Sequence, residues 1–334
     1  MFTRRQFLLT SAAGAASTAT GLVSRALAQE KLKQATIVVG VPAGGATDVL
    51  ARIHAEGLRL SYAHSVIVEN RPGAGGSIAL EYVKNARPDG SVLFFTPAYP
   101  IIVSPHVSTN LPYDTLRDLV PVGVGARSML AFAVGPSVPA SVKTLAEYVQ
   151  WCKTNPKQLL YGAQNGSSQH FAGMLFARSS GLSLQNVSYK GGAPIIQDLL
   201  GGHLPASISP VAEAIPHHKS GKLRVLAVTG ARRSRFLPEV PSMQELGHKA
   251  VLFQDWLGMF APAKTPMEQV NRINAAMAQA VRSEHGAAGL ARMGIEPEIV
   301  PADRFAAMVK ADWERYRSIV QTTGFKATLQ DQFK

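Results

Sequence analysis

The sequence of 334 residues predicts an α/β fold in two lobes, joined by two crossover segments that border a central cleft. Apolar runs alternate with amphipathic helical patterns through residue 230, which is typical of parallel sheets covered by helices. After residue 262 the patterns predict helices without new strands, so these helices are expected to pack on the first sheet. The chain would then cross between the lobes twice, near residues 125–135 and 250–260.

The first α/β series covers residues 35–97. Its elements alternate as strand, helix, strand, helix and strand at residues 35–41, 48–60, 65–70, 77–86 and 91–97. This order predicts a parallel sheet that binds ligands at the carboxyl ends of its strands. A looser stretch without a regular pattern then leads to the apolar run LAFAVGP at residues 130–136.

The second series begins at that run. Thr144 and Glu147 have the spacing of a capping box, so a helix is expected from Thr144 to about Asn155. The other elements predicted are strands at 159–163, 186–191, 206–210 and 223–230, and helices at 168–180, 194–200 and 211–220. Residues 236–247 are rich in proline and predict a loop with one short helix.

The C-terminal part begins with a strand at residues 254–262. Thr265 and Glu268 form a second capping-box pattern, with Pro266 in the favoured first helical position. Helices are expected at residues 266–283, 286–293 and 303–323. These elements place the predicted lobe boundaries at 29–129 plus 255–334 for lobe 1, and at 130–254 for lobe 2.

Residues 1–28 have the pattern of a twin-arginine signal peptide. Arg4 and Arg5 precede a weakly apolar segment, and Ala26-Leu27-Ala28 supplies the small residues that favour cleavage after Ala28. The alternative, a basic and alanine-rich membrane anchor, is disfavoured because glycines and hydroxyls interrupt the apolar run. We therefore expect the twin-arginine machinery to export the precursor, and the mature chain to be soluble in the periplasm.

Charge and motifs restrict the classes of ligand. The full chain carries +12, and residues 1–28 contain three arginines and no acid, so the mature chain carries about +9. No basic run with interleaved aromatics indicates a nucleic acid, and a basic surface instead attracts small anions. The histidine spacing predicts no metal site, and the sequence lacks the complete motifs that bind dinucleotides or nucleotide phosphates, so no cofactor is expected. Cys152 is the only cysteine and is expected to pack as a small apolar residue.

Two glycine-rich turns, GVPAGGATD at 40–48 and YGAQNGSSQH at 161–170, each stand between a predicted strand and a predicted helix. The first amides of a helix lack intrahelical acceptors and carry partial positive charge. Glycine lets these amides approach a ligand closely, so such a turn can bind an anion without a charged side chain. Each hydrogen bond to a charged group stabilises a complex by about 1.5–3 kcal/mol, so two turns that close on one ligand could hold a carboxylate.

Structural roles, without any ligand, would also explain the residues of these two turns. Gly44 and Gly45 could simply make a tight connection, and Asp48 could cap its own helix. Ser168 could be an N-cap, and His170 could pack against the turn. A third glycine turn, RPGAGG at residues 71–76, lacks the full dinucleotide-binding pattern.

Several motifs in the chain resemble those of the Bug family, the extracytoplasmic solute receptors of tripartite tricarboxylate transporters. The similarity covers about residues 33–325. The motifs that carry it are IVVGVPAGGATDVLAR, VIVENRPGAGGSIALEYVKNARPDG, LPYDTLRDLVPVG, YGAQNGSSQHFAGMLF, SYKGGAPIIQDLLGGH, KSGKLRVLAVTGARRSRFLPEVPSMQELG and WLGMFAPAKTP. The resemblance implies a type II periplasmic-binding-protein fold that closes on small ligands, usually carboxylates. It places the ligand loops at Pro42–Asp48, Gly166–His170 and Tyr189–Ala193.

The sequence and the resemblance together predict a solute-binding protein and not an enzyme. Gly44, Gly45, Ala46 and Thr47 are expected to bind one carboxylate, and Gly166, Ser167, Ser168 and His170 the other end of the ligand. The remaining candidates are Ala43 and Asp48 in the first turn and Tyr99, Lys190, Gly191 and Ser209 along the cleft. The expected partners are a small organic carboxylate and the membrane subunits of a tripartite tricarboxylate transporter.

Two other functions stay open at this point. One is an exported serine hydrolase that uses Ser167 or Ser168 with His170, although the GxSxG pattern is absent. The other is a binding protein that presents its ligand to a membrane sensor. Tricarboxylates, dicarboxylic amino acids, aromatic carboxylates and nicotinic-type amides fit the sequence equally well as ligands.

Overall fold

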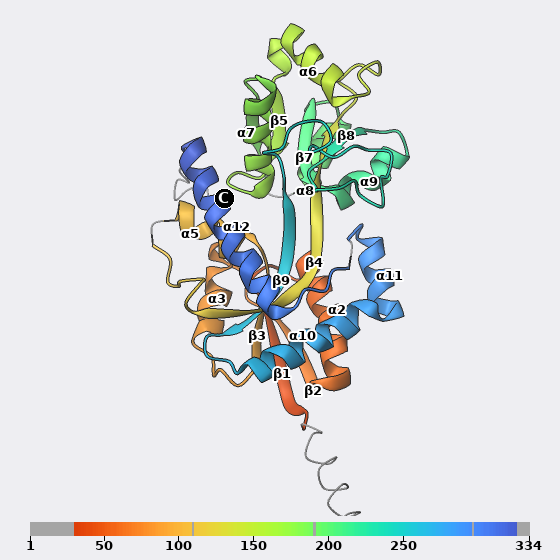
Figure 1. The fold of residues 1–334 in the computed structure, drawn as a ribbon. Coiled ribbons are helices and arrows are strands. Elements are labelled where there is room, and N and C mark those ends of the chain that lie inside the picture. The colour runs from red at the N-terminus through yellow and green to blue at the C-terminus, as the bar shows by residue number, and fades with distance from the viewer. Residues whose placement is uncertain (1–29, 109, 190–191, 296, 326–334) are drawn as a thin grey trace, which may run out of the picture.

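The computed structural model describes residues 30–108, 110–189, 192–295 and 297–325 of the chain. These residues form two α/β lobes that lie end to end (Figure 1). The predicted signal peptide, Lys190 and Gly191 lie outside the described residues. No helix within the described ranges is both long enough and apolar enough to cross a bilayer.

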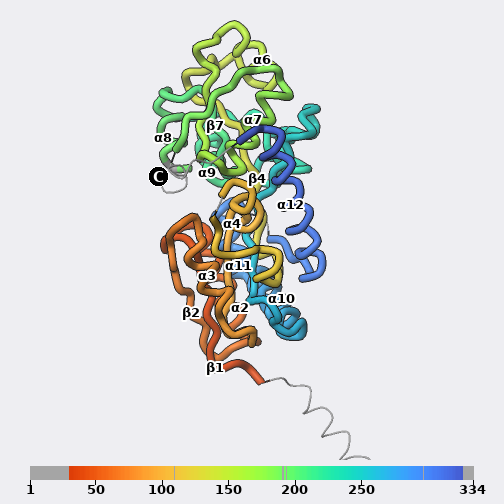
Figure 2. The backbone as a smooth tube through the Cα atoms, turned by 90° about the vertical axis from the view of Figure 1, so that its left-hand side faces the viewer, coloured from red at the N-terminus to blue at the C-terminus, as the bar shows by residue number. Residues whose placement is uncertain are grey.

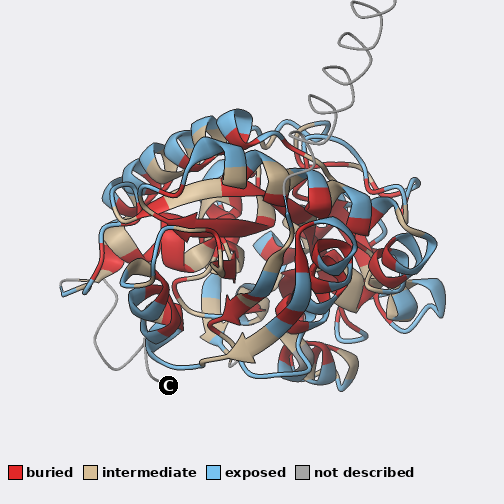
Figure 3. Ribbon diagram, turned by 90° about the horizontal axis from the view of Figure 1, so that it is seen from below, coloured by how far each residue is buried: buried red, intermediate tan, exposed pale blue. Residues whose placement is uncertain are grey.

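The sheet of the first lobe has the strand order β2-β1-β3-β9-β4. Strand β1 pairs in parallel with β2 and β3, which confirms the parallel β-α-β-α-β series, whereas β9 runs antiparallel to both β3 and β4. The strands are β1 (Leu32–Val39), β2 (Ala63–Asn70), β3 (Val92–Pro97), β4 (Leu119–Val134) and β9 (Gln254–Pro262). Buried residues make up most of β3, β4 and β9, whereas the edge strand β2 is mostly exposed or intermediate, and exposed residues lie on the outer faces of the helices (Figure 3).

Helices cover both faces of this sheet. On one face α2 (Ala46–Ser61) and α10 (Met267–Arg282) pack together on β1, β3 and β9, and α11 (Glu284–Arg292) joins the same apolar cluster. A Cβ added at Gly57 of α2 would lie 2.4 Å from the Cβ of Ala280, so this close contact of α2 with α10 requires glycine. The C-terminal helices therefore pack on the first sheet, as predicted. On the other face lies α3 (Ser77–Lys84).

The second lobe extends the sheet through β4 to β7, β5 and β6, with β8 also paired to β4. Helices α6 and α7 cover one face around Phe132, Tyr148 and Phe176, and α8 and α9 cover the other. The strands are β5 (Leu160–Ala163), β6 (Gln185–Ser188), β7 (Ala206–Pro210) and β8 (Arg224–Val228); the helices are α6 (Leu145–Thr154), α7 (Ser168–Ser180), α8 (Gly192–Leu200) and α9 (Val211–Lys219). The prediction that Cys152 is buried is confirmed.

Strands β4 and β9 form the two connections between the lobes. They pair antiparallel from Leu119 opposite Pro262 to Met129 opposite Gln254, with two irregularities in register. Helix α12 (Ala302–Thr323) lies along this junction (Figures 1 and 2). The indole Nε1 of Trp256 in β9 donates a hydrogen bond to Asp312 of α12 at 3.0 Å, so α12 is attached directly to one of the connecting strands.

Some local predictions were right and others were wrong. Thr144 and Glu147 form the predicted capping box, but the one predicted at Thr265 is absent. The Thr265 hydroxyl instead donates to the carbonyl of Pro262, and α10 begins one residue after Pro266. Residues 236–247 form turns without the expected short helix. Two short helices that were not predicted, α4 (Tyr99–Ile102) and α5 (Ser104–Val107), lie before and at the start of the loose stretch, and its end belongs to β4.

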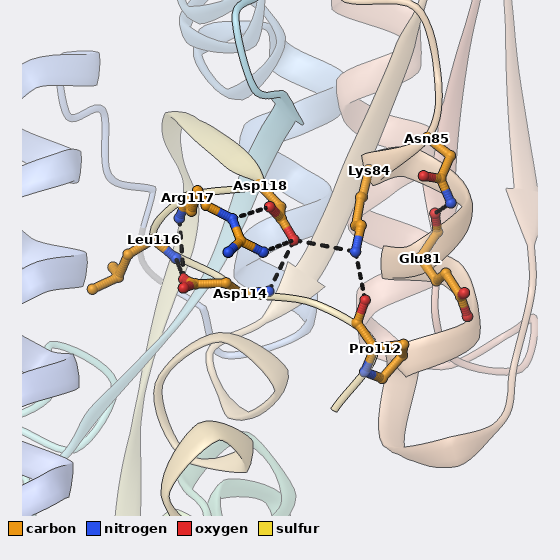
Figure 4. A network of polar contacts seen from close by, with 8 residues as sticks. All are labelled: Glu81, Lys84, Asn85, Pro112, Asp114, Leu116, Arg117 and Asp118. Atoms are coloured by element: carbon orange, nitrogen blue, oxygen red, sulfur yellow. Dashed lines mark hydrogen bonds and ion pairs between the residues drawn. The ribbon is translucent and has the colours of Figure 1, made fainter. Parts of the chain in front are cut away.

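A polar network fixes α3 to the segment that leads into β4 (Figure 4). Lys84, in the last turn of α3, donates to the carbonyl of Pro112 at 2.6 Å and pairs with Asp118 at 3.3 Å. Asp118 also accepts from the backbone N–H of Asp114 and from Arg117. The hydrogen bond from Arg117 is the largest influence on Asp118 and, with these other contacts, lowers its pKa to about 2. The network therefore holds the C-terminal end of α3 and thereby helps to position its N-terminus.

Candidate ligand-binding site

A cavity of about 550 Å³ lies between the two lobes, within the size range of small-molecule sites. Its walls come from two glycine turns of the first lobe, from α4 and α5, from the turn before α7 in the second lobe, and from β9 and α12. The lining residues include Gly40–Pro42, Pro72–Ser77, Thr96–Pro100, Ser104, Gln164, Asn165, Ser167–Gln169, Asp255 and Tyr316. The cavity is thus built by parts of the chain that are far apart in sequence.

The turn before α3 forms one wall of the cavity. Its backbone is in the left-handed region from Gly73 to Gly76, with φ of +95° at Gly76, the N-cap residue of α3. Within the described part of the chain no side chain caps this helix, so its first amides have no side-chain acceptor there. In the sequence this third turn stands out only as an incomplete dinucleotide motif, so it is not among the predicted site residues. The same strand–glycine–helix pattern that selected the other two turns would have found it.

The first glycine turn reaches the cavity through Gly40, Val41 and Pro42, whereas Ala43–Asp48 follow just beyond the lining residues. Helix α2 also begins without a side-chain cap, at the N-cap residue Gly45. Asp48 does not cap this helix: its carboxylate accepts the N–H of Gly44 at 3.0 Å and bonds from Arg52 and Asn70. Burial would raise the pKa of Asp48, but these hydrogen bonds hold it below its usual value. Asp48 therefore shapes the turn.

The second-lobe turn satisfies most of its own polar groups. Ser167 caps α7 by accepting the N–H of His170 and donates to the carbonyl of Gln164 at 2.6 Å. The N–H of Gly166 donates to Nδ1 of His170 at 3.1 Å. Burial lowers the pKa of His170 to about 4, so the imidazole is neutral at pH 7. Ser167 and Ser168 line the cavity, while Gly166 and His170 support the turn outside the lining.

The hydroxyl of Ser168 donates to a carboxylate oxygen of Asp255 at 2.5 Å. Since the hydroxyls of Ser167 and Ser168 donate to Gln164 and Asp255, neither is bonded to the imidazole of His170. The described geometry therefore lacks the serine–histidine pair on which the hydrolase alternative depends.

The remaining predicted residues fall in different places. Tyr99 lines the cavity, and burial raises its pKa, so its phenol is a neutral hydrogen-bonding group. Ser209 is completely buried in β7, opposite Ala131 of β4, and its hydroxyl has no hydrogen-bond partner among the described residues. It does not line the cavity.

Two acidic residues with raised pKa values were not predicted. Asp255 lies on the cavity wall, and burial raises its pKa to about 6. Glu213 lies in the first turn of α9, and a Cβ added at Gly192 would lie within 2.3 Å of all three carboxyl atoms of Glu213. Burial raises the pKa of Glu213 to about 7, and its Oε2 has no hydrogen-bond partner among the described residues. In sequence each is a single acid in an otherwise ordinary element, so no local signal marks it.

Replacing Glu213 by glutamine is expected to stabilise the fold by about 1–3 kcal/mol at pH 8. The pKa of this acid is higher in the folded chain than in the unfolded chain, so its ionised form opposes folding. That penalty is complete above pH 7 and disappears as the pH falls toward 4.5. Urea unfolding of both proteins at pH 8 and pH 5 should show a gain that shrinks at the lower pH. An equal gain at both pH values would contradict this assignment.

Two α/β lobes around a cavity lined by both of them form the architecture of solute-binding proteins. The chain belongs to the tripartite tricarboxylate transporter family of receptors, whose sequence model matches residues 50–325. The chain is 31% identical to the protein BugT of Bordetella pertussis over 87% of this chain and 89% of that protein. It is also 31% identical to a protein encoded in the gbd 5′ region of Cupriavidus necator, over 96% and 98% of the two chains.

Solved structures show the same fold. The protein Rpa4515 of R. palustris, solved with adipate, is 31% identical and superposes with a TM-score of 0.75 over 87% of this chain and 97% of that chain. MatC from Rhodopseudomonas palustris, with bound malate, is 25% identical with a TM-score of 0.70 over 86% and 98%. The periplasmic binding protein BugD is 26% identical with a TM-score of 0.72 over 88% and 99%. The family and the two-lobed fold predicted from the sequence are therefore confirmed.

Proposed function

We propose that this protein captures a small organic carboxylate in the periplasm and presents it to the membrane subunits of a tripartite tricarboxylate-type transporter. The observation that carries the proposal is the cavity between the lobes, which is bordered by the turn before α3, a helix N-terminus that none of the described side chains caps. Helix N-termini attract anions through free amides and the helix dipole. The adipate and malate in the two related structures support a carboxylate as ligand.

Binding is expected to close the two lobes. The first lobe offers helix N-termini and the hydroxyls of Ser77 and Tyr99, whereas the second lobe offers Ser167 and the amides of Gln164 and Asn165. A ligand that contacts both walls stabilises the closed state more than the open state, and only such a difference shifts the equilibrium. Strands β4 and β9 connect the lobes and are the natural hinge. The closed form would be the state that the transporter recognises.

The predicted site residues enter the proposal in two groups. Gly44, Gly45, Ala46 and Thr47 are proposed to approach the carboxylate on closure, because the turn that contains them begins at the cavity wall. Lys190 and Gly191, which lie outside the described residues, are proposed as further ligand-binding residues. The signal peptide at residues 1–28 is proposed to direct export. The predicted lobe boundaries, 29–129 plus 255–334 and 130–254, stay predictions.

A thermal-shift screen with carboxylates and with uncharged amides tests the proposed function. A ligand at 100 times its dissociation constant stabilises the folded state by about 2.7 kcal/mol, which corresponds to a rise in Tm of about 5 °C for a chain of this size. The expected result is such a rise with at least one small carboxylate. A screen in which only amides or no compound raises the Tm would contradict the proposal.

Replacing Gly45 by leucine tests the first glycine turn. The backbone at Gly45 has φ of −77°, and an added Cβ would meet nothing closer than the carbonyl oxygen of Pro42 at 4.0 Å. The variant is therefore expected to fold with nearly unchanged stability. The leucine side chain should hinder access to the amides of α2 and weaken the binding of the best carboxylate by about tenfold, about 1.4 kcal/mol. Unchanged affinity, measured by calorimetric titration, would remove this turn from the site.

A further inference from the structure

Asp255 places a negative charge on the cavity wall, and the negative charge of a carboxylate ligand would not complement it. It is the second residue of β9 and lines the cavity, partly buried, where this strand approaches the second lobe. One oxygen of its carboxyl group accepts the hydroxyl of Ser168 at 2.5 Å. No other donor to this carboxyl group is found in the part of the chain that the structure describes. The group therefore retains an acceptor oxygen for a ligand.

The surroundings of Asp255 do not neutralise it. Across the sheet it faces Ser128 of β4, whose hydroxyl donates to its neighbour's carbonyl. From α12 it faces Asp312, Arg315 and Tyr316; the guanidinium of Arg315 donates to the carbonyl of Leu252 and lies over the ring of Phe253. Burial and the charge of Asp312 raise the pKa of Asp255, against the opposing effects of Ser168 and Arg315. With its pKa at about 6, the group is mostly ionised at pH 7 and above.

The rest of the cavity provides no cation. Of the described residues that line it, Asp255 alone has a side chain that is charged at neutral pH; the others are glycines, prolines, aliphatic residues, hydroxyls and amides. A partly buried carboxylate that forms no ion pair with a described residue is costly, so a ligand that supplies a cation gains affinity there. The two walls thus have opposite character. The turn before α3 attracts an anion, and Asp255 attracts a hydrogen-bond donor or a cation.

We propose that the cleft selects a carboxylate that also carries a protonated amino group, such as an amino acid, and that Asp255 binds this ammonium group. The inference rests on the proposed function, because it names the chemical class of the solute that the same cleft captures. The carboxylate would lie against the N-terminus of α3 and the ammonium group against Asp255 and Ser168. A dicarboxylate without an amino group would place its second negative charge near Asp255 and bind less tightly.

Calorimetric titration with matched pairs of compounds at pH 8 tests the proposal. The probes are the twenty common amino acids and their deaminated analogues, including aspartate with succinate and glutamate with glutarate. The expected result is that at least one amino acid binds tenfold or more tightly than its analogue, about 1.4 kcal/mol. Asp255→Asn should remove this preference by weakening the amino acid about tenfold while the analogue binds equally or more tightly. Asparagine still accepts the Ser168 hydroxyl, so the local structure is expected to persist.

Two further measurements separate a contact from a general charge effect. Glu314→Gln removes a negative charge from an exposed position of α12 and should leave both affinities unchanged. Protonation of Asp255 below its pKa should weaken the amino acid about tenfold between pH 8 and pH 5 in the unmodified protein, but not in Asp255→Asn.

The possible outcomes distinguish this inference from the proposed function. If the deaminated compounds bind as tightly as the amino acids or more tightly, the inference is overturned and the carboxylate receptor stands. If Asp255→Asn leaves the preference for amino acids unchanged, Asp255 does not bind the ammonium group of the ligand, and the inference is also overturned. If no compound of either series binds, both proposals fall.

Discussion

Replacing Trp256 by alanine is expected to lower the free energy of unfolding by about 3–5 kcal/mol, the usual cost of truncating a large buried aromatic residue. The side chain of Trp256 is only 1% exposed. Its ring packs against Phe260 and Phe305, with ring centres 5.9 and 5.1 Å away. Its indole N–H is also the donor to Asp312 of α12. Alanine would leave a cavity at the junction of the lobes, and the partly buried carboxyl group of Asp312 would lose this donor.

The conservative variant separates these two contributions. Trp256→Phe retains most of the aromatic contact but removes the donor to Asp312, which is expected to cost about 1–3 kcal/mol. Urea unfolding followed by circular dichroism would measure both variants. A loss below about 1 kcal/mol for Trp256→Ala would show that α12 does not depend on this contact with β9.

Replacing Gly76 by valine is expected to weaken carboxylate binding by about 1.5–3 kcal/mol, about ten- to 150-fold, because hydrogen bonds from the first amides of α3 to the anion are lost. Gly76 lines the cavity and has φ of +95°, a conformation that a β-branched residue adopts only with strain. An added Cβ would also lie 3.1 Å from Cγ of Pro100. Valine should therefore displace the N-terminus of α3 and fill space that the ligand needs.

Gly247 offers a matched control for the strain. It has φ of +86°, no atom lies within 4 Å of an added Cβ, and it is not among the residues that line the cavity. Gly247→Val should carry a similar backbone cost yet leave the affinity for the carboxylate unchanged. Calorimetric titration of the two variants compares them directly. Equal affinities for Gly76→Val and Gly247→Val would exclude the α3 turn from the site.

Much of the fold follows from local patterns in the sequence. The alternation of apolar runs with amphipathic segments predicts the parallel pairing of β1 with β2 and β3 in the first lobe. It also predicts the order of the elements in the second lobe. The length of β4 could not be predicted, because Pro121, Gly123 and Gly125 interrupt its pattern. Pairing with β9 on its whole first half, with two irregularities in register, compensates for these interruptions. That pairing is a tertiary effect that a local pattern does not contain.

The candidate site could be predicted only in part. The sequence identified glycine turns before helices, and residues from both chosen turns border the cavity. Which residues of each turn face the cavity depends on internal hydrogen bonds, such as those from Gly44 to Asp48 and from Gly166 to His170. Asp255 approaches Ser168 only because β9, which pairs with β4, begins beside the second lobe before it runs back to the first. A local sequence pattern does not predict a contact between segments so far apart in the chain.

A crystal structure of the protein with the carboxylate that raises its Tm most tests the central claim most directly. The account predicts one ligand between the lobes, with a carboxylate oxygen within hydrogen-bonding distance of a first-turn amide of α2 or α3 and a second contact to the turn before α7. A ligand that lies outside this cavity, or that touches only one lobe, would contradict the account.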